Sequence, residues 1–434
     1  QPRISFQNQL ALTGVRLPAQ EVKAGSKLSI DTRWQALGPM PRDYHVSLRL
    51  ADATGRPWAQ LDEPLQEEFS HREPGIYWDV TDRFRPTRWA VGQVVLQEHV
   101  LELPTAVPAG RYYLVARVYD LDSGYALVSR AEGGRRLPGG DTIVGTVQVR
   151  ARGPVATESL AMEHRLDLEA APGLQLLGCG LLPGSIKAGR DLGVALYWRV
   201  QGEPGNVRLE YRLVEGGAVR QRWFEPIADG PMPQGQVYIG GDVLALSDEL
   251  AGGQYGLELQ VLDPSGQALG HALPLGELTV APRPDRATVL QGLAQRLEGI
   301  RFGEGIGLLG YTIGPGKAES GGVTELVLYW ECLAPVGNEY KVFTHLLDST
   351  GAIQGQRDDI PEAGAAPTST WQVGDVIVDR YEIPVSAEAR GALQVEIGLY
   401  EPLTGARLPL QRDGQPTGED HLILPTAVMP TPTQ

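Results

Sequence analysis

One spaced pair of residues recurs three times along the chain and constrains its fold more than any other feature. Each copy has a Leu-x-Gly, then a turn, then an alternating apolar strand that reaches a Trp, and the Leu and the Trp lie 22 positions apart. The three pairs are Leu12 and Trp34, Leu176 and Trp198, and Leu308 and Trp330. We interpret this pattern as the frame of one domain that the chain uses three times.

The repeat extends beyond the pair itself. Eight positions of the first copy return 296 positions later without a gap, namely Ile4, Phe6, Leu10, Leu12, Gly14, Trp34, Asp52 and Gly55. The middle copy follows the first at an offset of 164 and diverges after its Trp. Repeats of this length are too long for solenoid units, so each copy should bury a core of its own. The sequence therefore predicts three domains, 1–153, 154–284 and 285–434, joined by short Pro-containing linkers, with a Pro/Thr tail on the third.

The strand that ends at each Trp alternates between apolar and polar residues. This period of two predicts an antiparallel strand that is covered on one face. The 54 Gly and 33 Pro punctuate the whole chain and favour many short strands. We predict an all-β fold of three tandem antiparallel β-sandwiches, immunoglobulin-like or jelly-roll-like, with Trp34, Trp198 and Trp330 in their cores. Residues 289–297 have helical spacing and would form a linker helix or a short extended segment.

The third copy carries a series of motifs in a distinctive order. These are LLGY at 308–311, LYW at 328–330, YKVFTHLLD at 340–348, PTSTW at 367–371 and GLYEPLTGARLP at 398–409. Together they resemble a β-sandwich domain at the C-terminus of bacterial membrane-bound glycosyltransferases of the dolichyl-phosphate-mannose type, which also occurs in related surface proteins. The resemblance covers about residues 300–425, is looser in the first copy and poor in the second. It implies a non-cytoplasmic sandwich module; the membrane-embedded catalytic region of those enzymes is absent, so no catalytic residue is implied.

Composition excludes some classes of partner. The net charge is −15, and no cluster of Lys and Arg offers the positive potential that nucleic acids or anionic membranes require. No apolar run reaches the length needed to span a bilayer, so we expect no membrane insertion by this chain. The seven His show no metal-site spacing, and we expect no metal or other cofactor. His345 should lie on the surface, and Cys332 should be a small buried thiol rather than half of a disulfide with Cys179.

Aromatic residues in loops are the best candidates for ligand or partner contacts. The first copy has an insertion, at about 56–88, that holds Trp58, Tyr77, Trp78 and Phe84 and ends just before Trp89. Trp371 occupies the matching Pro-Thr…Trp element of the third copy. Aromatic rings grouped in a loop can stack on sugars or fill a partner's pocket. The alternative is that these rings fold inward over their own sandwich.

These features lead to two main hypotheses. The first is a non-catalytic extracellular or cell-envelope protein, structural or adhesive, that associates with itself in a filament or layer or with another surface protein. The second is a carbohydrate-binding accessory module of a glycan-processing system, with a glycan as its partner. A hydrolase is a weaker third possibility, because adjacent acidic pairs such as Asp358 and Asp359 are usually solvated rather than facing each other across a cleft. Any export signal would lie outside this chain.

Overall fold

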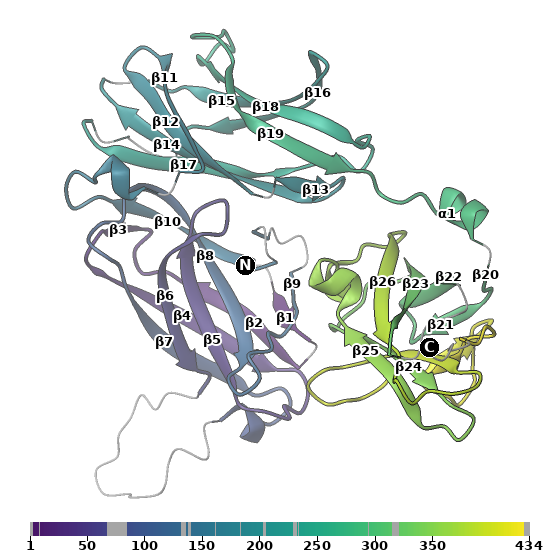
Figure 1. The fold of residues 1–434 in the computed structure, drawn as a ribbon. Coiled ribbons are helices and arrows are strands. Elements are labelled where there is room, and N and C mark those ends of the chain that lie inside the picture. Colours follow the sequence, from purple (N-terminus) through teal and green to yellow (C-terminus); the bar gives the residue numbers. More distant parts are fainter. Residues whose placement is uncertain are drawn as a thin grey trace, which may run out of the picture. The chain divides into compact units, whose positions relative to one another are not determined.

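The computed structural model describes residues 3–7, 9–66, 85–131, 136–137, 140–160, 162–182, 184–202, 205–228, 232, 234–293, 295–314 and 321–428. Strands dominate these residues, and the predicted all-β fold is confirmed. The chain divides into two compact units, Gln1–Pro282 and Arg283–Gln434, which we describe separately (Figure 1).

The first unit begins with a sandwich of two sheets. One sheet has the order β7-β4-β2-β1-β9 and consists of β1 (Ile4–Phe6), β2 (Leu10–Arg16), β4 (Lys27–Ala36), β7 (Val94–Glu102) and β9 (Ser129–Ala131). The facing strands are β3 (Glu21–Lys23), β5 (Tyr44–Ala51), β6 (Pro57–Pro64), β8 (Ala109–Asp120) and β10 (Thr142–Arg150). The 3₁₀ turn η2 (Pro86–Arg88) precedes β7.

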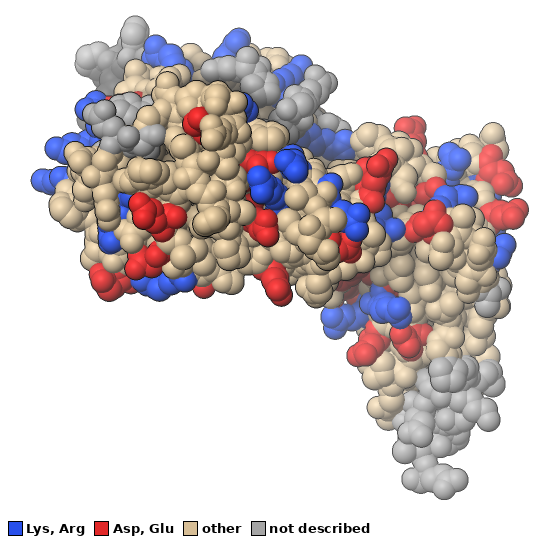
Figure 2. Space-filling view, turned by 90° about the horizontal axis from the view of Figure 1, so that it is seen from above, with Lys and Arg blue, Asp and Glu red and all other residues tan. Residues whose placement is uncertain are grey.

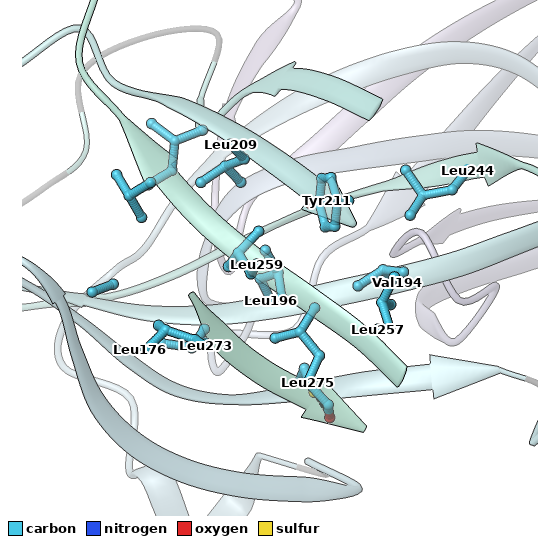
Figure 3. Close-up of a cluster of buried hydrophobic side chains, with 14 of the residues drawn as sticks. Leu176, Val194, Leu196, Leu209, Tyr211, Leu244, Leu257, Leu259, Leu273 and Leu275 are labelled. Carbon is cyan, nitrogen blue, oxygen red and sulfur yellow. Dashed lines mark hydrogen bonds between the residues drawn. The ribbon is translucent and has the colours of Figure 1, made fainter. Parts of the chain in front are cut away.

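A second sandwich completes the first unit and follows the 3₁₀ turn η3 (Thr157–Ser159). Its first strands are β11 (His164–Ala171), β12 (Leu174–Leu182), β14 (Asp191–Val200) and β17 (Val237–Ala245). Its other sheet contains β13 (Ser185–Lys187), β15 (Arg208–Glu215), β16 (Ala218–Pro226), β18 (Gly253–Leu262) and β19 (Leu273–Ala281). Leu and Tyr side chains from both sheets meet in its core, among them Leu196, Tyr211 and Leu259 (Figure 3).

The second unit begins with α1 (Arg286–Gly292), where Asp285 caps the first turn by accepting a hydrogen bond from the Thr288 amide. One sheet contains β20 (Gln295–Arg296), β21 (Ile300–Phe302), β22 (Ile306–Ile313), β23 (Val323–Cys332), β26 (Val376–Pro384), β28 (Leu410–Arg412) and β29 (Gln415–Pro416). The other contains β24 (Lys341–Leu347), β25 (Ile353–Asp359), β27 (Gln394–Tyr400) and β30 (Leu422–Ile423). The 3₁₀ turns η4 (Pro361–Gly364) and η5 (Thr368–Thr370) precede β26.

The repeated spacing of 22 residues is explained by strand register. Leu12 pairs with Trp34, Leu176 with Trp198 and Leu308 with Trp330, and in each copy the register shifts between this Leu and the Gly two residues later. A Cβ atom at Gly178 or Gly310 would overlap with a carbonyl oxygen of the preceding strand, at His164 or Gln295 respectively. The Leu-x-Gly therefore combines a β-bulge with a close approach of two backbones.

Candidate functional site

The three Trp residues of the repeat are fully buried, each with 0% of its surface exposed. Trp34 packs against Phe6 and Trp330 packs against Phe302, with ring centroids 5.7 and 5.9 Å apart. They occupy the core position that the sequence suggests, and none presents a ring to solvent.

Two of the aromatic residues proposed as ligand contacts also lie in the cores. Trp89 and Trp371 are each only 5% exposed, and the indole of Trp371 donates a hydrogen bond to the Ala366 carbonyl. The Pro-Thr…Trp element thus folds its Trp inward after a 3₁₀ turn, so neither ring is placed to stack on a sugar. Sequence reasoning could not separate these alternatives, since either residue could have pointed outward from its loop.

Trp58 is half-buried and held by its neighbours. Its indole donates to Asp52 Oδ2 at 3.0 Å, the Arg56 guanidinium lies 4.9 Å above its ring, and Tyr112 meets it edge-on. Asp52 also accepts hydrogen bonds from Thr54, so Trp58 is part of the fixed Asp-Gly turn. The remaining candidates, Tyr77, Trp78 and Phe84, lie outside the described residues.

A direct strand pair joins the two sandwiches of the first unit. β8 runs parallel to β17, with Ala109 opposite Tyr238 and Gly110 opposite Ile239. Through this pair the second sheet of the first sandwich continues into the second sandwich, as one sheet of nine strands. Backbone pairing therefore crosses between the two copies, a feature that the sequence analysis does not anticipate. We call this region, centred on β8 and β17, the junction.

Glycine makes the close approach at the junction possible. A Cβ atom on Gly110 would overlap with the carbonyl oxygen of Ile239 across the junction. One on Gly241 would overlap with the carbonyl oxygen of Val194 in β14, the neighbouring strand of the second sandwich. Gly241 also has a φ of +118°, which side-chain-bearing residues rarely adopt. Glycines inside strands are the sequence signal that could have indicated this contact.

A buried ion pair lies beside these glycines. Asp242 is 1% exposed and accepts hydrogen bonds from Arg111 Nη2 at 2.9 Å, from the Tyr113 hydroxyl at 3.1 Å and from the Val243 amide at 2.9 Å. Arg111 Nη2 also donates to the Gly241 carbonyl at 2.8 Å. Removing two charges from water is costly, so such a pair adds little stability itself but strongly disfavours any arrangement that separates its members.

Apolar side chains from both sandwiches pack together beside the ion pair, and two of them belong to Tyr113 and Val243, which bond to Asp242. They form one buried cluster of Ala51, Ala53, Tyr113, Val115, Leu137 and Val243. The junction therefore combines backbone pairing, a satisfied buried charge pair and hydrophobic contact. This combination predicts that the two sandwiches move as one body.

Each core Trp has a different polar environment at its indole nitrogen. In the third copy Trp330 Nε1 donates to Asp379 Oδ2 at 3.1 Å, and this fully buried carboxylate also accepts from the Tyr381 hydroxyl and from the Glu362 amide. Burial raises the pKa of Asp379 to about 6, although its hydrogen bonds oppose the shift. The Glu362 amide belongs to η4, so Asp379 fastens this turn to the core.

The corresponding places in the other two copies hold different residues. In the first copy Trp34 Nε1 donates to Thr32 Oγ1, which also contacts His99 Nε2 at 2.9 Å. In the second copy Gly240 stands where the third has Asp379, and Trp198 Nε1 has no hydrogen-bond partner within the described residues. Asp379, the carboxyl group whose pKa burial raises to about 6, thus has no acidic counterpart at the corresponding position of the second copy.

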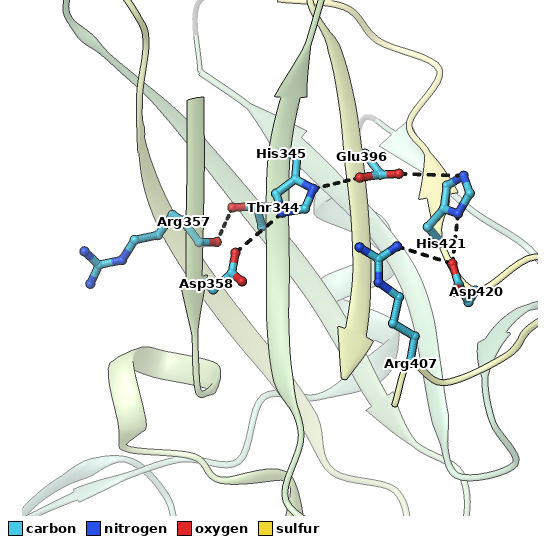
Figure 4. A network of polar contacts seen from close by, with 8 residues as sticks. All are labelled: Thr344, His345, Arg357, Asp358, Glu396, Arg407, Asp420 and His421. Atoms are coloured by element: carbon cyan, nitrogen blue, oxygen red, sulfur yellow. Dashed lines mark hydrogen bonds and ion pairs between the residues drawn. The ribbon is translucent and has the colours of Figure 1, made fainter. Parts of the chain in front are cut away.

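A row of alternating acids and imidazoles crosses the outer face of the sheet formed by β25, β24, β27 and β30 (Figure 4). His345 Nδ1 lies 2.7 Å from Glu396 Oε2, and its Nε2 lies 3.8 Å from Asp358 Oδ1. His421 Nε2 lies 3.7 Å from Glu396 Oε1, and its Nδ1 lies 3.1 Å from Asp420 Oδ1. His345 lies on the face opposite the buried Val342, Thr344 and Leu346, as predicted, although its neighbours leave its side chain only 12% exposed.

This row also anchors a loop on the sheet. Arg407 reaches Asp420 at 3.4 Å and lies 4.2 Å above the ring of Phe343, while Gly398 leaves room for that ring. Every imidazole nitrogen in the row already faces a carboxylate, which leaves none directed toward a substrate or metal. The arrangement therefore supports a structural role, and three carboxylates with two imidazoles and one Arg hold the strands and loop together.

Other chemistry is scarce in the described part of the chain. No group of three or more His, Cys, Asp and Glu side chains there is arranged to hold a metal ion. Cys179 and Cys332 are both buried thiols outside any disulfide, as expected for Cys332, and burial raises the pKa of Cys179 to about 12. Among the described helices, none is long and apolar enough to cross a membrane. Acidic and basic side chains are interspersed on the face shown in Figure 2.

Comparisons with known proteins add little to this description. No protein-family model matches the chain, and no curated protein matches it. A crystal structure from Corynebacterium diphtheriae, described as that of a membrane anchored protein, aligns over 98% of this chain and 93% of its own. The identity is 11% and the TM-score is 0.18, which is too low to support an argument about fold or function.

Proposed function

We propose that this chain is a non-catalytic structural or adhesive protein of the cell envelope or the extracellular space. The observation that carries the proposal is the junction, where β8 pairs with β17 around the Arg111–Asp242 ion pair. A module that transmits force or holds binding faces apart needs sandwiches that do not hinge, and a shared sheet meets this need. The resemblance of the third copy to extracytoplasmic sandwich domains supports the proposed location.

The carbohydrate-binding hypothesis receives less support from the aromatic candidates. Trp89 and Trp371 are buried, and Trp58 is fixed by Asp52 and Tyr112. A platform built on these three rings would require the sandwiches to open. We therefore place the structural role first, with a second copy or another surface protein as partner.

The test is the state of assembly of the native protein. Negative-stain images and light scattering over a range from nanomolar to tens of micromolar should show regular filaments, sheets or closed oligomers. A deletion of residues 67–84 serves as a control, because it removes most of the first-copy insertion, with Tyr77, Trp78 and Phe84, and leaves all described strands. A monomer at every concentration would contradict self-assembly, and turnover of a glycan or peptide panel would contradict a non-catalytic role.

A further inference from the structure

The second unit contains a cavity that the proposed structural role does not explain. It has a volume of about 370 Å³ and opens on the outer face of β22 and β23. Its floor includes Gly307 and Glu331, one wall is α1 and the other is the segment 296–301. This volume lies within the range of small-ligand sites.

The other two copies show how this place on the sheet is normally filled. Gly307 pairs directly with Glu331 in the third copy. At the same register the second copy pairs Gln175 with Arg199, and the first pairs Ala11 with Gln35. The floor of the cavity is therefore a residue pair that recurs in all three copies with a different composition in each.

In the second copy the chain's own polar side chains fill the position. Gln175 Nε2 donates to Asp167 Oδ1 at 2.8 Å, and Arg199 Nη1 donates to Gln175 Oε1 at 3.3 Å. In the first copy Arg3 reaches across to Gln35 at 3.3 Å. A carboxylate and a carboxamide thus fill this position in the second copy.

The third copy keeps the backbone and removes these side chains. Gly299 stands at the position of Asp167, and both have a left-handed φ, +69° and +54°. Gly307 stands at the position of Gln175. Asp413 Oδ1 lies where a Cβ atom on Gly299 would stand, so another segment supplies the carboxylate and only the carboxamide of Gln175 has no counterpart.

Cations line the resulting cavity in excess of anions. Arg286, Arg296 and Arg301 face it with Glu298 and Glu331. Arg286 Nε is held by Glu331 Oε1 at 2.8 Å, whereas Arg296 and Arg301 have no ion-pair partner among the described residues. Leu290, Leu297 and Leu333 add apolar walls. Two unpaired guanidinium groups beside an apolar wall favour an organic anion.

We propose that this cavity binds a small organic carboxylate with further polar groups, of the size of one sugar acid or one acidic amino-acid residue. Its carboxylate takes the place of the Gln175 side chain of the second copy and is bound by Arg301 and Arg296. Its polar groups face Glu331 and Arg286, and its carbon skeleton contacts the leucine wall. The two sources of such a group are a uronic acid of a glycan and an acidic side chain of a peptide.

Calorimetric titration of the full chain with D-glucuronate and with N-acetyl-glutamate separates these sources, and glucose is the neutral control. Arg301→Gln should weaken binding at least about tenfold, since it removes a charge-assisted contact. Gly307→Gln restores the Gln of the second copy and should abolish binding; its Cβ would meet Leu333 Cδ1 at 3.1 Å, and its other contacts are at ordinary distances of 3.4 Å or more. Arg380→Gln is the matched control, because Arg380 is an exposed Arg of the same unit outside the cavity.

Binding of either carboxylate, lost in Arg301→Gln and Gly307→Gln but kept in Arg380→Gln, supports the site and names its source. The proposal is overturned if neither carboxylate binds at about 10 mM, a level that would reveal even a millimolar dissociation constant. It is also overturned if glucose binds equally well, or if binding is the same in all three variants. Unchanged circular dichroism of Arg301→Gln confirms that lost binding does not reflect unfolding.

Discussion

The buried carboxyl group of Asp379 predicts an unusual dependence of stability on pH. Its pKa is raised from 3.8 to about 6 in the folded protein, chiefly by burial. The folded state therefore holds this proton more tightly than the unfolded state does, so stability falls as the pH rises from about 4 through about 6. A shift of this size corresponds to about 3 kcal/mol in the free energy of unfolding of the third sandwich.

The change that tests this reasoning is Asp379→Asn, which keeps the size of the side chain and removes its charge. Hydrogen exchange of the β23 and β26 peptides, corrected for the intrinsic rate at each pH, reports the opening of this core. In the wild-type chain protection should fall by a factor of about 25 between pH 4.5 and 7.5, and the variant should lose most of that fall. Asn has one acceptor oxygen, so it cannot accept both from the Glu362 amide on one side and from Trp330 and Tyr381 on the other, and the variant should lose some protection at every pH.

Asp348→Asn is the control for this experiment. Asp348 is an exposed turn residue whose pKa is lowered to about 2, first by its hydrogen bond with Thr350, so it is ionised across the whole range. Its removal should leave the slope between pH 4.5 and 7.5 unchanged. The reasoning is refuted if Asp379→Asn and the wild-type chain show the same slope, or if wild-type protection rises over this range relative to the variant.

Three further predictions concern the junction, the repeat and the thiols. Asp242→Ala removes the carboxylate that pairs with the buried Arg111, so it should destabilise the first unit by about 3–5 kcal/mol in thermal unfolding. Asp31→Ala breaks the exposed ion pair with Arg16 and should cost less than about 1 kcal/mol. Equal effects of the two substitutions would contradict a buried pair at Asp242. Gly310→Ala should destabilise the second unit in thermal unfolding, because its Cβ atom would overlap with the Gln295 carbonyl oxygen. Gly405→Asn is the control and should be tolerated, because Gly405 has a left-handed φ and open space around it. A Gly310→Ala protein as stable as the wild type would refute the close approach. Cys179 and Cys332 should not react with a thiol reagent at pH 8 until the protein is denatured, and fast reaction of the native protein would show that a core opens.

The sequence predicts those features that depend on residues within one copy. The 22-residue spacing of Leu308 and Trp330 predicts a shared frame because both the register and the bulge are local to one pair of strands. The alternation of the same strand predicts its buried face for the same reason. The linker helix lies a few residues earlier than predicted, since the capping residue Asp285 sets its start and helical spacing alone does not.

Features that depend on contacts between distant segments are not predictable in this way. The pairing of β8 with β17 joins residues of different copies, and Gly110, which lies in the middle of no turn, is its mark in the sequence. The orientation of Trp89 and Trp371 depends on how a loop packs, and the half-burial of His345 depends on the loop that carries Arg407. The cavity beside Gly307 is recognised by comparing the residue pairs of the three copies at the same strand register. A glycine in the sequence does not by itself indicate that a side chain found in another copy is absent.

The central claim is that the junction makes the first two sandwiches one mechanical body, and stretching single full-length chains tests it most directly. We predict that Gln1–Pro282 unfolds in one step that releases roughly 1,000 Å of chain, separately from a step of roughly 500 Å for the second unit. Asp242→Ala should split the larger step into two. Two steps of roughly 500 Å for the first unit of the wild-type chain would contradict the claim, because each sandwich would then unfold on its own.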